Sequence, residues 1–293
     1  MSSTRVTRYI HAGCKLILLA LCALATADAA AQNDNTASYT PEELRRHFQQ
    51  TAEAYQMKSD RQELTLRKQP LMNWKNPVRT QSQGALYVWE KKGRPQVLGS
   101  IFTYQYNGTI RCRHELISLA DGPLSSSLHS EVVWSPNRAG LDWQQYESGL
   151  VPAESASRRL FQMRSIARRF TGKITNGSDT TTLTLIPQPL LRYDAPDDGV
   201  IDGAVFSFAM GTDPEILLVI EAKQFKAGSP AFRYAPARAN FQALNLALEG
   251  RQVWNVPFER EYLNTRAGQK PWSDGPFFPM TPNQPLPPPE QLR

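Results

Sequence analysis

Cysteine is scarce in this sequence, with three residues among 293. Two of them, Cys14 and Cys22, lie in an N-terminal segment that we expect to be removed. The remaining chain keeps a single thiol, Cys112, so it cannot form an internal disulfide. Its stability must come from an apolar core. About 260 residues can build such a core as one large domain or as two of ordinary size.

Charge of one sign is modest as well. The chain has 33 Lys and Arg residues against 27 Asp and Glu residues, a net charge of +6. Loss of the first 31 residues removes three cations and one carboxylate, which lowers the net charge to +4. Such a small excess gives no reason to expect nucleic acid as a partner.

Long apolar runs are missing. The run at residues 16–25 is shorter than the ~20 residues of a membrane-spanning helix. Arg5 and Arg8 precede it, and three alanines follow it directly before Gln32. This is the pattern of a signal peptide. We therefore expect residues 1–31 to be a signal peptide, no transmembrane segment, and export to the periplasm or the extracellular space.

Catalytic signatures are missing too. The sequence has no G-x-S-x-G, no P-loop, no glycine pattern for dinucleotides and no H-E-x-x-H. These absences lower the expectation of an enzyme without excluding one. We expect no cofactor.

The sequence does contain a long internal similarity. QPLMNWKNPVRTQSQGALYVW at residues 69–89 returns as QPLLRYDAPDDGVIDGAVFSF at residues 188–208, a shift of 119 positions. Ten identities run without a gap from Asp60 to Ala85 at this shift. Chance would supply one or two, so we infer an internal duplication.

Each repeated unit is expected to begin with a helix. Thr40-Pro41-Glu42-Glu43 forms a capping box with proline in the first turn. The apolar residues that follow share one helical face in each unit. They are Leu44, Phe48, Ala52 and Tyr55 in the first unit, and Leu160, Met163, Ile166, Ala167 and Phe170 in the second.

Antiparallel strands are expected after each helix, because Lys92-Gly93 and Asn107-Gly108 suit hairpin turns. The predicted fold is α+β, a tandem duplication of a helix followed by an antiparallel β-meander, packed as one pseudo-symmetric body. The units are residues 40–152 and 153–257. Residues 258–293 are a proline-rich tail in extended form, which could lie across the body through Trp272, Phe277 and Phe278.

The best hairpin of the chain carries the predicted binding residues. If Asn107-Gly108 is a two-residue turn, Tyr106 pairs with Thr109 and the register of both strands follows. One face of the hairpin then carries Glu115 together with the four residues that are named at the end of this paragraph as predicted ligand-binding residues. Alternating aromatic and guanidinium groups could hold a sugar, an anion or a peptide, unless a helix or the tail covers them. The predicted ligand-binding residues are Phe102, Tyr104, Arg111 and Arg113.

The opposite face of that hairpin carries Cys112 and His114 with apolar residues. Two residues apart on one strand, their side chains stand about 6.5–7 Å apart, too far for direct proton transfer. We therefore expect Cys112 to be a buried thiol and His114 to be a hydrogen-bonded histidine. His129-Ser130-Glu131 resembles the start of a deaminase motif whose P-C-x-x-C half is missing. A zinc site using His114, His129 and two carboxylates is a weaker alternative.

Two charged segments complete the candidates. Asp194, Asp197, Asp198 and Asp202 form an acidic loop without the spacing of a known calcium loop. It could pair with the basic residues 75–79. Arginines on the outer face of the second helix could touch anionic lipid, although a solvated face is the simpler explanation. The two Asn-Gly-Thr/Ser sequons could simply be turns.

Several runs carry a family resemblance: WKNPVR, QGALYVW, GRPQVLGSIF, RCRHELISL, PQPLLRYDAP, VIDGAVFSFAMGTDPEILLVIEA and RQVWNVP. Together they span roughly Trp74 to Pro257. Over this span the chain resembles a family of uncharacterised exported proteins associated with planctomycete bacteria. The resemblance implies a bacterial envelope setting. No activity, ligand or catalytic residue is carried over from this family to the chain.

The expected function is therefore non-catalytic binding or carriage of a small molecule or envelope component. A hydrolase using His114 and a structural envelope component are the alternatives. Both catalytic residues and ligand identity stay open.

Overall fold

The structure is a computed structural model that describes residues 39–77, 82–106, 108–225, 228–259, 275–280 and 286–292. The predicted signal peptide, residues 1–31, lies outside these ranges. The chain divides into two compact units, Met1–Asn35 and Thr36–Arg293. Every described residue belongs to the second of them.

The predicted fold class is wrong, because the described part of the protein is mostly β: strands make up 56% of the described residues and helices 15%. A single meander does not follow each helix. The strands instead divide among four antiparallel sheets. The reason lies in strands such as β15 (Asp213–Lys223), which is buried on both faces over most of its length. A helix covers only one face of a sheet. A sheet that is buried on both faces therefore needs a second layer on its other face.

The first part of the chain forms one helix and two sheets. The smaller sheet has the order β2-β1-β8-β9, and the larger has the order β19-β7-β6-β5-β3, with β4 also paired to β5. The elements are α1 (Pro41–Ala54), β1 (Tyr55–Ser59), β2 (Gln62–Glu63), β3 (Thr65–Leu66), β4 (Met72–Asn76), β5 (Ser82–Lys91), β6 (Arg94–Tyr106), β7 (Thr109–Ser118), β8 (Leu124–Leu128) and β9 (Glu131–Trp134).

The second part forms the other helix and two further sheets, with the orders β12-β11-β17-β18 and β10-β16-β15-β14-β13. Its elements are β10 (Gln144–Gln145), α2 (Ala156–Ala167), β11 (Phe170–Asn176), β12 (Asp179–Thr182), β13 (Thr184–Ala195), the 3-10 turn η1 (Pro196–Asp198), β14 (Val200–Met210), β15, β16 (Ala231–Arg238), β17 (Ala243–Leu248) and β18 (Arg251–Val256).

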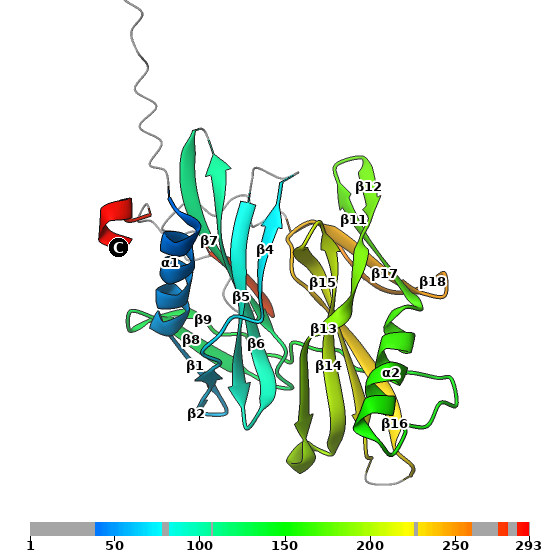
Figure 1. Ribbon diagram of the computed structural model, residues 1–293. Helices are drawn as coiled ribbons and strands as arrows, with labels where there is room; N and C mark the ends of the chain where they lie inside the picture. Colours follow the sequence, from blue (N-terminus) through cyan, green and yellow to red (C-terminus); the bar gives the residue numbers. More distant parts are fainter. Residues whose placement is uncertain are drawn as a thin grey trace, which may run out of the picture. The chain divides into compact units, whose positions relative to one another are not determined.

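The first of the two described helices begins where the sequence predicts. The Glu43 backbone N–H donates to the Thr40 hydroxyl at 3.2 Å, and the Glu43 carboxylate accepts from the Thr40 backbone N–H at 2.8 Å. This confirms the capping box. Ser155 caps α2 by accepting from the backbone of Arg158. The apolar face of α1 packs against β5 and β6, and that of α2 packs against β13, β14 and β15 (Figure 1).

Three apolar cores hold these layers together. The first lies between α1, the smaller sheet and the larger sheet of the first part, and the second is built in the same way around α2. The third joins the two larger sheets, with Leu98 and Ile117 from one and Val205 and Val219 from the other. The two larger sheets therefore pack on each other through one buried apolar surface.

The repeated stretches at residues 69–89 and 188–208 form related hairpins. Trp74 pairs with Gly84 in one, and Tyr193 pairs with Gly203 in the other. Upstream of these pairs they differ, because β3 and β4 are separate short strands while β13 runs on through a register shift. Trp74 is 2% exposed, so its side chain packs within the body.

The C-terminal segment contacts the first part of the chain. β19 (Phe277–Met280) pairs with β7, and both Phe277 and Phe278 are buried. The short turn η2 (Pro289–Leu292) contacts α1, where a guanidinium nitrogen of Arg46 donates to the Leu292 carbonyl at 2.5 Å. Trp272 lies outside the described residues. Neither described helix has the length and apolar character that crossing a membrane requires.

Candidate functional site

The predicted hairpin register is confirmed, since Tyr106 pairs with Thr109 and Thr103 with Cys112. Cys112 and His114 therefore point into the first core and are buried. Phe102, Tyr104, Arg111 and Arg113 lie on the other face, together with Tyr106. We call these five residues the aromatic–arginine face.

Gly84 shapes the inner end of the aromatic–arginine face. It stands between Trp74 on β4 and Phe102 on β6 in the strand register. A Cβ atom at position 84 would lie 2.4 Å from Cβ of Phe102, so only glycine fits there. The Trp74 and Phe102 rings consequently meet across β5, with centroids 5.2 Å apart. Trp74 is fixed in turn by its indole N–H, which donates to Ser100 at 3.1 Å.

The outer end carries two cation–π pairs. The Arg113 guanidinium lies 4.8 Å from the centroid of the Tyr104 ring, and the Arg111 guanidinium lies 4.8 Å from that of Tyr106. Arg113 also donates to the Tyr104 hydroxyl at 3.4 Å. Both pairs are diagonal neighbours across the β6–β7 ladder, which suits long side chains. Exposure rises along the face and reaches 52% at Tyr106.

The cysteine and the histidine of the same hairpin are placed for packing. Burial raises the pKa of the Cys112 thiol to about 12. Burial, with a smaller contribution from His47, lowers the pKa of His114 to about 3. Nδ1 of His114 lies 2.8 Å from the Tyr55 hydroxyl. At neutral pH the thiol therefore stays protonated and the imidazole stays neutral, so neither is activated as a nucleophile or a strong base.

The zinc alternative also lacks support. His129 is exposed in the turn between β8 and β9, with a φ of 50°, whereas His114 is buried in the core. In the ranges that the structure describes, no group of three or more His, Cys, Asp or Glu side chains is arranged to hold a metal ion.

The acidic loop has partners that the sequence did not indicate. Asp197 pairs with Lys92 at 3.0 Å, and Asp198 pairs with Arg94 at 3.3 Å. Asp202 is bound by Arg159 and Arg192 on the far side of the loop. The expected pairing with residues 75–79 is not observed for Lys75, whose backbone instead bonds to Thr212. Arg79 lies outside the described residues.

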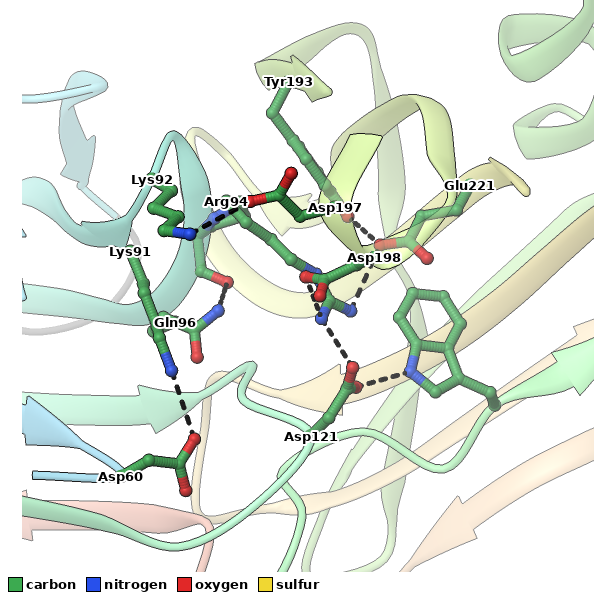
Figure 2. Close-up of polar contacts among 12 residues, drawn as sticks. Asp60, Lys91, Lys92, Arg94, Gln96, Asp121, Tyr193, Asp197, Asp198 and Glu221 are labelled. Carbon is green, nitrogen blue, oxygen red and sulfur yellow. Dashed lines mark hydrogen bonds and ion pairs between the residues drawn. The ribbon is translucent and has the colours of Figure 1, made fainter. Parts of the chain in front are cut away.

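These ion pairs line a charged cleft of about 560 Å³. Its walls come from the β1–β2 turn, the β5–β6 turn, the loop after β7, and η1. Figure 2 shows Lys91 reaching Asp60 on one side while Lys92 reaches Asp197 on the other. The lining has three cations against four carboxylates, and each of these cations is already paired, so the cleft offers no free positive charge to an anionic ligand.

Arg94 lies at the base of the charged cleft and connects the two larger sheets. It donates to Asp121 at 2.5 Å and lies 3.4 Å from the fully buried Glu221 (Figure 2). Burial opposes the charge of Arg94, but the hydrogen bond that it donates to Asp121 and the charges of Glu221 and Asp121 outweigh burial and raise the pKa of Arg94. Glu221 also accepts from Tyr193 at 2.7 Å and from Arg233 at 2.7 Å. This network is an internal connection between sheets.

The sequence contained a partial signal for this network. The turn Lys91-Lys92-Gly93-Arg94 is basic and the loop at Asp197-Asp198 is acidic. The basic turn and the acidic loop meet because the two larger sheets pack on each other. A local sequence pattern does not predict that packing.

The aromatic–arginine face therefore remains the candidate binding site. Comparison of the chain with known protein families, with curated proteins and with solved structures found no match.

Proposed function

We propose that the protein is a non-catalytic binding protein that holds an anionic ligand on the aromatic–arginine face. One observation carries this proposal: two guanidinium groups are stacked over tyrosine rings at the exposed end of a hairpin, Arg111 over Tyr106 and Arg113 over Tyr104.

Stacking prepares a guanidinium group for binding. A tyrosine ring beside a guanidinium group holds that group in place, and the N–H edges of the guanidinium can still bind a second group. Those edges match a carboxylate, sulfate or phosphate in two-point geometry. Because the side chains are already held, little conformational entropy is lost when a ligand binds. The exposed tyrosine and the partly buried Phe102 add apolar contact for the body of the ligand.

Catalysis finds less support than binding. The hydrolase alternative requires His114 to exchange protons, and its burial and low pKa oppose this at neutral pH. The structural alternative keeps one supporting observation, the continuous apolar core between the larger sheets. Export to the bacterial envelope and membership of the planctomycete family stay predictions from the sequence. If they hold, the anionic ligand is to be sought in the bacterial envelope.

The decisive experiment is native mass spectrometry of protein purified at low salt from its own host. We expect the wild-type chain to carry a retained anionic mass that high salt removes. The double variant Arg111→Gln/Arg113→Gln should lose this mass. The matched control Arg61→Gln/Arg138→Gln removes two exposed arginines elsewhere and should retain it. Equal masses in wild type and double variant, or no retained mass in any form, would favour the structural role.

A further inference from the structure

The outer face of α2 carries an unusual combination of exposed residues. Phe161 is 67% exposed, the highest value among the exposed large apolar residues of the described chain. Arg158 and Arg168 stand three residues before it and seven after it, so all three lie on one helical face. That face is opposite to Met163 and Ile166, which are buried in the second core. The phenylalanine therefore points away from the body between two arginines.

A second segment adds apolar surface beside this face. Val151 is 58% exposed and Leu150 is 39% exposed, and both lie in the loop between β10 and α2. The Gln162 side chain fastens the loop to the helix, because its amide donates to the Val151 carbonyl at 2.9 Å and accepts from the Ala153 backbone at 2.9 Å. We call Leu150, Val151, Phe161, Arg158 and Arg168 the α2 patch.

The charge around the α2 patch is positive. Residues 150–168 contain four arginines and one glutamate, Glu154. Arg159 is already bound to Asp202, and Arg164 contacts Gln188. Arg158 and Arg168 are exposed, and within the described ranges their side chains make no ion pair or hydrogen bond. Two cations thus remain available beside three exposed apolar side chains.

This chemistry fits a bilayer surface better than a protein partner. A stable protein interface needs a packed apolar centre within about 1,600 Å² of buried surface, whereas the apolar residues here are few and separated by charges. An anionic bilayer accepts such an arrangement: isolated apolar side chains enter the boundary of the acyl chains while arginines remain among the headgroup phosphates.

We propose that the α2 patch is a docking surface for membranes that contain anionic phospholipid, with Phe161 inserted and with Arg158 and Arg168 contacting the headgroups. The attachment is peripheral and reversible. It is independent of the ligand proposed for the aromatic–arginine face, which lies on the β6–β7 hairpin.

The test is co-sedimentation of the full chain with vesicles of equal parts phosphatidylcholine and phosphatidylglycerol, compared with phosphatidylcholine alone. We expect binding to the anionic vesicles that weakens as salt increases. Arg158→Gln/Arg168→Gln should lower the partition coefficient about 25-fold, at about fivefold for each arginine near a charged surface. Phe161→Ser should lower it without changing the salt dependence.

Matched controls distinguish membrane binding by the α2 patch from an effect of the total charge or of any exposed apolar side chain. Arg61→Gln/Arg138→Gln removes the same charge elsewhere, and Val132→Ser removes a side chain that is 55% exposed on β9. Both should bind as the wild type does, with circular dichroism showing that all variants fold. The proposal is overturned if wild-type protein binds both vesicle types equally or not at all, or if the patch variants bind like the controls.

Discussion

Arg94 and Glu221 lie 3.4 Å apart although 127 positions separate them in the chain. The glutamate is fully buried and shares the contact with Tyr193 and Arg233. A buried charge without partners is strongly unfavourable, so these groups depend on one another. The four side chains tie the two larger sheets together at the edge of their common core.

Replacement of Glu221 by glutamine should therefore destabilise the protein. The change keeps the shape of the side chain but takes the carboxylate partner from Arg233 and one of three carboxylates from the buried Arg94. We expect a loss of about 3 kcal/mol or more in the free energy of unfolding, measured by urea titration. The control Lys92→Gln breaks an exposed pair of the same cleft and should leave the midpoint unchanged. Similar midpoints for both variants would contradict a coupled buried network.

Acid should destabilise the protein through His114. Its pKa is about 3 in the folded state, against an ordinary value of about 6.5. Between these values the unfolded chain binds a proton that the folded chain does not, so stability falls as the pH drops below about 6.5. The loss should be on the order of 3 kcal/mol by about pH 4.

His114→Gln tests this acid effect, because glutamine does not titrate and can still hydrogen-bond to Tyr55. The free energy of unfolding, measured from neutral to acidic pH, should fall less steeply than in the wild type. His129→Gln is the control, since His129 is exposed in a turn. An unchanged slope in His114→Gln would show that the imidazole is protonated in the folded protein.

Cys112 should resist alkylation in the folded protein. Its thiol is buried and its pKa is raised, so little thiolate forms and reagent has poor access. Labelling with iodoacetamide, followed at Cys112 by peptide mass mapping, should be slow without denaturant and should accelerate across the unfolding transition. Rapid labelling well below that transition would mean that the hairpin opens locally.

Gly84→Ala should strain the inner end of the aromatic–arginine face. The new methyl group would lie 2.4 Å from Cβ of Phe102 and 2.7 Å from the Ile101 carbonyl oxygen. Such overpacking costs about 1–3 kcal/mol of stability and should alter the fluorescence of Trp74. Gly122→Ala is the matched control, because a Cβ there meets no atom within 4 Å. Equal stability of the two variants would show that β5 and β6 can separate without loss.

Features set by neighbouring residues could be predicted from the sequence. The capping box at Thr40 and the pairing of Tyr106 with Thr109 follow from short-range rules, and both are confirmed. Once the register of a hairpin is fixed, the alternation of side chains decides which residues are buried. The separation of the buried Cys112 from the outward Arg111 could therefore be derived from the turn alone.

The fold class and the charged cleft could not be predicted in this way. β1 pairs with β8, far along the chain, and this choice depends on layers that form only in the folded protein. β15 is buried on both faces, and its apolar run does not specify which layers cover them. In the same way, the sequence predicts an acidic loop but does not predict that Lys92 and Arg94 are its partners.

The last strand of the chain completes the first large sheet, because β19 pairs with β7 after the whole second part has intervened. A ribosome must translate 162 residues beyond Leu116 before Phe278 can pair with it. Until then the outer edge of β7 offers unpaired backbone groups, the kind of edge to which stray strands add. Nascent chains that stall before residue 277 would thus be prone to aggregate, because the edge of β7 stays unpaired until β19 has been made.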